Sequence, residues 1–141
     1  MIRNSAETRL FRTILVEENG KKKDVAQAGK QSCAFFVSSI LYLFQLIDQP
    51  HAMVATTIKK MEEEGWYCIQ KPRAGSVLVW GPKKILGSVN RHIGFYRGSA
   101  QAISNDAMKG FPIPHHWTYG KRKSGKPTRA VEAIYWHKKL D

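Results

Sequence analysis

Cysteine is scarce in this sequence of 141 residues, which contains only Cys33 and Cys68. Two cysteines in unlike contexts do not form the disulfide framework of a small secreted domain. Neither belongs to a CxxC motif or to a Cys/His cluster at ligand spacing. Because structural zinc needs four such ligands, we expect no structural zinc site.

Long apolar runs are also missing. The longest, residues 34–47, is shorter than a bilayer-spanning helix and contains Ser38, Ser39 and Gln45. The amino terminus lacks the apolar segment of a signal peptide. The sequence therefore predicts neither a membrane span nor export, and it leaves the localisation and the oligomeric state open.

Acidic residues are few: 11 Asp and Glu stand against 23 Lys and Arg, a net charge of +12. Such a charge favours polyanionic partners, either nucleic acid or an anionic cell-wall polymer. The neighbouring glycines equally suit solvated loops, and neither basic cluster has the spacing of a groove-reading element. The two clusters are Lys21, Lys22 and Lys23, and Lys121, Arg122 and Lys123 with Lys126 and Arg129.

The apolar pattern predicts helices first and strands afterwards. Residues 32–47 carry apolar side chains at i, i+3, i+4 and i+7, which predicts a helix deep in the core, and a second helix is expected at 52–64. For residues 5–17 we favour a helix, although Asn19-Gly20 is a strong hairpin signal that keeps a strand at 13–17 open. A period of two then predicts strands at 66–70, 76–80, 92–97, 100–105, 115–119 and 130–136.

This order predicts an α+β fold, with an antiparallel sheet packed against the helix that carries Cys33 at its amino end. The length suits one domain spanning residues 1–141. We expect residues 108–141 to belong to the same sheet.

Cys33 and His92 are the candidates for catalysis. A helix amino terminus lowers the pKa of a cysteine, because its free N–H groups and dipole favour the thiolate. His92 opens an alternating strand and shares a face with Gly94 and Tyr96, so that glycine leaves space beside the imidazole. Considered alone, Cys33 could be a small buried residue of the core, and His92 could be a histidine at a strand end that solvent satisfies. Considered together, the two residues suit a nucleophile and its base.

A catalytic histidine needs a polar partner on its second ring nitrogen. Asn105 is the first candidate, because its strand should pair with the His92 strand across the turn at Gly98. Asp106 and Ser104 are alternatives. His115 and His116 come one strand later, which favours a role near the substrate or in the structure, although His115 also stays open as the third catalytic residue.

Three further side chains are candidates for the oxyanion site or the cleft. Gln27 precedes Cys33 by six residues, where its amide could help a backbone N–H hold an oxyanion. Gln31 and Ser32 are rival donors next to the nucleophile. Trp117, beside two histidines, is the candidate for lining the cleft.

Three segments in this order resemble the NlpC-like and CHAP group of papain-fold cysteine peptidases and amidases. They are QSCAFFV at 31–37, PRAGSVLVW at 72–80 and RHIGFYRG at 91–98. The resemblance covers residues 25–107, and residues 108–141 have no counterpart in it.

The resemblance implies hydrolysis of peptide or amide bonds in bacterial peptidoglycan, without a metal or cofactor. Cys33 would be the nucleophile, His92 the base and Asn105 the residue that orients it. Two alternatives remain: the same fold acting on a protein substrate as a toxin or effector, and a non-catalytic basic module that binds nucleic acid or wall polyanion. If the family reading holds, a chain without a signal peptide would reach the wall as an effector, as a phage enzyme or by non-classical export.

Overall fold

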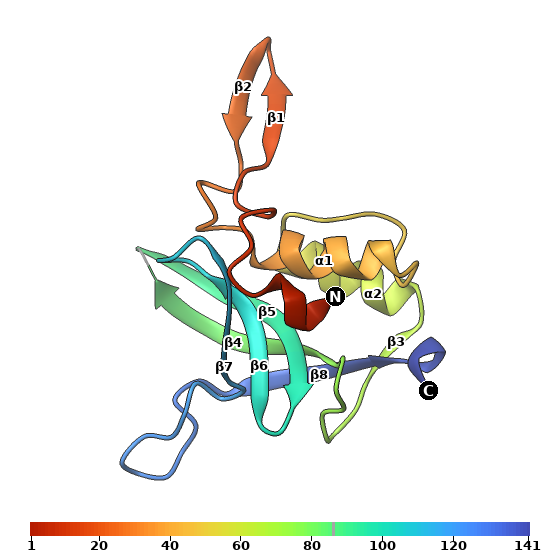
Figure 1. Ribbon diagram of the computed structural model, residues 1–141, viewed down its shortest axis with the longest axis vertical. Coiled ribbons are helices and arrows are strands. Elements are labelled where there is room, and N and C mark those ends of the chain that lie inside the picture. The colour runs from red at the N-terminus through yellow and green to blue at the C-terminus, as the bar shows by residue number, and fades with distance from the viewer. Residues whose placement is uncertain (86) are drawn as a thin grey trace.

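The computed structural model describes residues 1–85 and 87–141 and has an α+β architecture. Six strands form one antiparallel sheet in the order β3-β8-β4-β5-β6-β7 (Figure 1). Their bounds are β3 Trp66–Cys68, β4 Val77–Ile85, β5 Ser88–Gly98, β6 Gln101–Asp106, β7 Phe111–His116 and β8 Val131–His137. Residues 108–141 supply β7 and β8, so both strands belong to this sheet, as expected.

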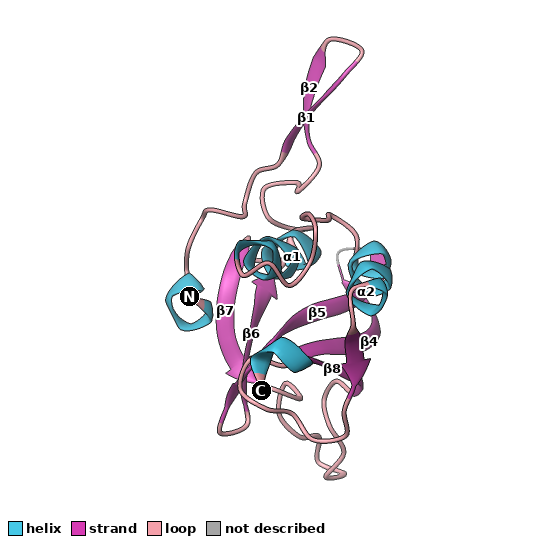
Figure 2. Ribbon diagram, turned by 90° about the vertical axis from the view of Figure 1, so that its right-hand side faces the viewer, coloured by secondary structure: helices cyan, strands magenta, loops and turns pink. Residues whose placement is uncertain are grey.

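Two helices, α1 (Cys33–Leu43) and α2 (Val54–Glu63), lie against one face of the sheet (Figure 2). The predicted α+β fold and its cysteine-bearing helix are confirmed. The buried side chains of α1 meet those of the central strands, and the Phe36 and Phe95 rings pack edge to face with centroids 5.7 Å apart. Ile93 and Phe95 therefore face the helix, and the intervening residues of β5 face the opposite side of the sheet.

The opposite face of the sheet carries a second, smaller apolar cluster. It contains Leu78, Trp80, Ala102 and Ile134, all buried, and the segment that follows β7 packs over it. The indole Nε1 of Trp80 donates a hydrogen bond to the carbonyl of Trp117 at 2.7 Å. Strand β5 therefore lies between both clusters: one of its faces packs on the helices and the other on the cluster around Trp80.

The structure contradicts the helix predicted at 5–17. A 3-10 turn covers Ile2–Ser5, and strands β1 (Leu15–Glu18) and β2 (Lys21–Asp24) form a separate hairpin that projects from the rest of the molecule (Figure 1). Asn19 and Gly20 take φ values of 52° and 73°, as a two-residue hairpin turn requires. The hairpin preference of Asn19-Gly20 outweighed the helical pattern because little of this segment enters the core: Leu10 and Leu15 are exposed.

Other boundaries also differ from prediction. Helix α1 ends at Leu43 rather than at residue 47, because Gln45 adopts a φ of 54°; Leu46 and Ile47 still turn inward and are buried. Strand β4 continues through Gly81-Pro82, where a break was expected, by means of a bulge between Trp80 and Lys83. The strand expected at 115–119 lies at Phe111–His116, with its two prolines on the edge of the sheet, where a missing N–H is tolerated.

The remaining predictions agree closely with the structure. Helix α2 lies within the expected range 52–64, with Met61 buried, and Gly65 follows it at a φ of 95°. No helix within residues 1–85 and 87–141 is long and apolar enough to cross a membrane.

Candidate active site

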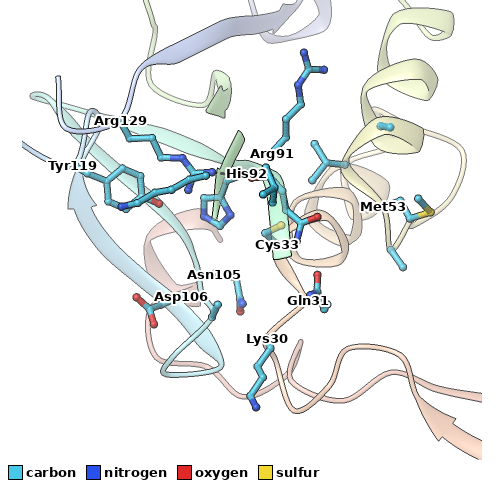
Figure 3. Close-up of a pocket in the computed structure, with 17 residues that line it drawn as sticks. Lys30, Gln31, Cys33, Met53, Arg91, His92, Asn105, Asp106, Tyr119 and Arg129 are labelled. Carbon is cyan, nitrogen blue, oxygen red and sulfur yellow. Dashed lines mark hydrogen bonds between the residues drawn. The ribbon is translucent and has the colours of Figure 1, made fainter. Parts of the chain in front are cut away.

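Cys33 is the first residue of α1 and lines a cavity of about 560 Å³ at the amino end of that helix (Figure 3). Burial raises the pKa of the Cys33 thiol, while the backbone N–H groups of Ile93 and Ala34 lower it. Burial is the largest of these effects, so the thiol is protonated in the free protein. The influence of Ile93 shows that the sulfur lies beside the β5 backbone, one residue from His92.

His92 lines the same cavity from β5, and its ring lies 5.5 Å from that of Trp80, centroid to centroid. Its Nε2 forms a hydrogen bond with Ser104 Oγ at 2.8 Å. Burial, followed by the positive charge of Arg129 and the neighbouring His115, lowers the pKa of His92 to about 3. Cys33 and His92 are therefore both neutral at pH 7, rather than a preformed thiolate–imidazolium pair.

Ser104 is the hub of the hydrogen-bond network behind His92. Its Oγ lies 2.8 Å from His92 Nε2, 2.8 Å from His115 Nε2 and 3.1 Å from the hydroxyl of Tyr119. The Tyr119 ring stacks on His115 with centroids 4.0 Å apart, and burial raises the pKa of Tyr119 to about 12. Tyr119 thus stays protonated and can donate to Ser104.

This network assigns the proton positions on His92. His115 Nδ1 lies 2.8 Å from the carbonyl oxygen of His116, which only accepts, so Nδ1 carries the proton. In neutral His115, Nε2 is then an acceptor and takes the hydroxyl hydrogen of Ser104. The Ser104 oxygen consequently accepts from Nε2–H of His92, whose lone pair lies on Nδ1. That lone pair is what a general base requires.

Gly94 allows the Ser104 contact to form. It pairs with Ser104 across β5 and β6, and a Cβ placed on Gly94 would lie 2.6 Å from Ser104 Cβ and 3.0 Å from the Trp80 ring. A larger residue would push these strands apart. Gly94 therefore serves close strand packing beside the imidazole: Ser104 and Trp80 occupy the space that the sequence was expected to leave open there.

Asn105 does not hold His92 in this structure. The Gly94–Ser104 register puts Ser104 on the face of His92 and turns Asn105 to the other face of the sheet. Asn105 Nδ2 donates to the carbonyl of Gly29 at 2.6 Å. Asp106 Oδ1 instead accepts backbone N–H groups of Met108 and Lys109. Ser104, an alternative at the sequence level, makes the contact that was expected of Asn105, and His115 supports it from behind.

The expected oxyanion and cleft residues lie in different places. Gln31 is exposed and lines the cavity, whereas Gln27, exposed at a φ of 51°, is not among the lining residues. Trp117 packs beneath the sheet against Tyr96, with ring centroids 6.0 Å apart, and does not line the cavity either. The backbone N–H groups of Cys33 and Ala34, at the start of α1, lie beside the thiol together with that of Ile93.

Arg129 and Tyr119 line the cavity as well, and sequence reasoning missed both as site residues. They belong to the segment between β7 and β8, for which neither spacing nor a motif gave a signal. Arg129 was counted within a solvated basic cluster, yet its side chain is 7% exposed. Only the return of this segment to the bulge of β4 brings Arg129 to the site.

The other basic clusters lie outside the cavity. In the hairpin, Lys21 lies opposite Glu18 and Lys22 opposite Glu17 across the two strands. Lys121, Arg122 and Lys123 are exposed in the segment before β8.

The chain matches no protein-family model, no curated protein and no solved structure. The geometry of the cavity is therefore the basis for a functional assignment. Its contents are a thiol at a helix start, a neutral imidazole with a fixed tautomer, and a buried guanidinium.

The lowered pKa of His92 predicts a loss of stability in acid. Its ordinary pKa is 6.5, so below pH 6.5 the unfolded chain binds a proton that the folded protein excludes until about pH 3. This contribution to stability is complete above about pH 6.5 and is lost as the pH falls, by up to about 1.4 kcal/mol per pH unit.

Chemical denaturation at pH 7 and pH 4.5 measures this loss. We expect the free energy of unfolding of the wild-type protein to fall by about 2 kcal/mol more between these pH values than that of a His92→Gln variant. The variant has no titrating side chain at position 92. Equal losses in the two proteins would contradict the assignment of a buried, neutral His92.

Proposed function

We propose that this protein is a cysteine peptidase or amidase of the papain-like, NlpC-related type. One observation carries the proposal: Cys33 at the amino end of α1 and His92 on β5 line one cavity, and Ser104 holds the far nitrogen of His92. A nucleophile, a base and a residue that orients the base are the minimum set for this chemistry.

The reaction begins with both groups neutral. As Cys33 Sγ attacks the amide carbon of the substrate, its proton passes to His92 Nδ1, and the N–H groups at the start of α1 stabilise the oxyanion. The C–N bond then breaks, and His92 returns the proton to the leaving amine. Water attacks the resulting thioester with His92 again as base, which releases a carboxylic acid and restores the thiol.

Electrostatics favour thiolate formation during attack rather than before it. The positive charge of Arg129 and the N–H of Ile93 both lower the pKa of Cys33, against the larger effect of burial. When a bound substrate brings its carbonyl to the thiol, Arg129 and the N–H of Ile93 stabilise the negative charge that develops during attack. They lower the barrier because they are already in position.

The proposed substrate is bacterial peptidoglycan, in which peptide stems offer amide bonds. The test is digestion of purified peptidoglycan, with the released fragments identified by mass spectrometry. Fragments cut at one type of amide bond, absent from a heat-inactivated control, support the proposal. Intact peptidoglycan together with cleavage or deamidation of a protein substrate would instead favour an effector with the same chemistry.

A further inference from the structure

Arg129 is held by backbone carbonyls, and its guanidinium lies 5.9 Å from the centroid of the Tyr119 ring. Its Nε and Nη2 donate to the carbonyl of Gly81 at 3.2 and 2.9 Å, and Nη2 also donates to the carbonyl of Asn90 at 3.2 Å. Gly81 lies within the bulge of β4, and Asn90 on the strand opposite it. The guanidinium is therefore rigidly held before any ligand arrives.

The charge of Arg129 is not neutralised by the protein. The salt bridges within residues 1–85 and 87–141 do not include it, and Glu132, the acid that influences it, forms an ion pair with Arg91 at 3.1 Å. At 7% exposure, a cation without a counter-ion is costly. Backbone carbonyls offset part of that cost, and a bound anion would offset the rest.

The guanidinium also faces the reacting groups. Arg129 lines the cavity and extends toward His92 (Figure 3). Its positive charge lowers the pKa values of both Cys33 and His92. An anion held by Arg129 would thus lie close to the bond that Cys33 attacks.

Asn105 supplies a second, independent feature of the same cavity. It is 2% exposed, and since its Nδ2 is bound to the carbonyl of Gly29, its other amide atom must be the acceptor Oδ1. Oδ1 is buried and has no hydrogen-bond partner within the described part of the chain. A buried acceptor of this kind requires a donor, such as an amide N–H of a ligand.

We propose that Arg129 forms a carboxylate-binding subsite beside Cys33, so that the substrate is a peptide with a free carboxylate next to the amide bond that is cleaved. This inference rests on the proposed function for its substrate, whereas anion binding itself does not require hydrolysis. Asn105 Oδ1 would accept an N–H of the same peptide.

Two probes of equal shape test the subsite in wild-type protein, namely N-acetylglycine and its neutral counterpart N-acetylglycinamide. We expect a saturable shift of the Arg129 Nε–H resonance in NMR spectra with the carboxylate only. An equal response to both probes, or none to either, would overturn the inference. This measurement requires neither a variant nor turnover.

Alkylation provides a matched kinetic test. The ratio of iodoacetate to iodoacetamide labelling should be about tenfold higher at Cys33 than at exposed Cys68, because a charge-assisted hydrogen bond favours the anionic reagent. Arg129→Gln should abolish this preference, and Arg122→Gln, the same charge change at an exposed site, should preserve it. A preference for iodoacetate at Cys33 that survives Arg129→Gln would overturn the inference, and so would a preference that Arg91→Gln removes instead. If Arg129→Gln does not fold, the NMR result decides.

The outcomes separate this inference from the proposed function. Undigested peptidoglycan with a carboxylate-specific NMR shift rejects peptidoglycan as the substrate and retains the subsite. Digestion without any carboxylate preference retains the hydrolase and rejects the subsite.

Discussion

Replacing Cys33 with serine is expected to lower the rate of peptide or amide hydrolysis by about four orders of magnitude or more. Serine keeps the size of the side chain and its place at the start of α1. Its hydroxyl is far less acidic than a thiol, so a neutral His92 with a pKa of about 3 is too weak a base to activate it.

The rate of fragment release from peptidoglycan, followed by mass spectrometry, measures this effect. Cys68→Ser is the matched control, because Cys68 is exposed and outside the cavity, and it should retain full activity. Turnover by Cys33→Ser within tenfold of wild type would show that another group is the nucleophile.

Ser104→Ala is expected to lower kcat by about two to four orders of magnitude, with a much smaller change in KM. The substitution removes the acceptor that holds the Nε2–H tautomer of His92 and leaves His115 without its donor. His92 then loses the fixed lone pair on Nδ1, as when the orienting residue of a catalytic triad is replaced.

Two measurements separate this effect from a general loss of structure. Nitrogen NMR of the His92 ring should show the Nε2–H tautomer in wild-type protein and a mixture in Ser104→Ala. Ser124→Ala, at an exposed serine before β8, should change neither the tautomer nor kcat. An unchanged His92 tautomer in Ser104→Ala would refute the role assigned to Ser104.

The helix bearing Cys33 and the histidine strand could be predicted because local pattern determines them. The apolar spacing of α1 reflects its packing on the sheet, and the alternation around His92 follows from the two faces of β5. The same spacing predicted an α1 that is too long at its carboxyl end. Leu46 and Ile47 fit the apolar pattern because they are buried, but they lie in a turn after the helix.

The partner of His92 depended on strand register, which the sequence left open. A shift of one residue exchanges Ser104 for Asn105 on the His92 face, and only the observed Gly94–Ser104 pairing decides between them. Arg129 could not be predicted at all, because the bulge that receives it forms from residues 39 to 48 positions away.

The central claim is that His92 activates Cys33, and the ratio of Cys33 to Cys68 labelling by iodoacetamide at pH 7 tests it without a known substrate. Exposed Cys68 is the internal reference, because its labelling rate reports the reactivity of an accessible thiol toward the same reagent. With His92 as base, His92→Gln should lower this ratio by at least about tenfold. An unchanged ratio in the folded variant would contradict the account.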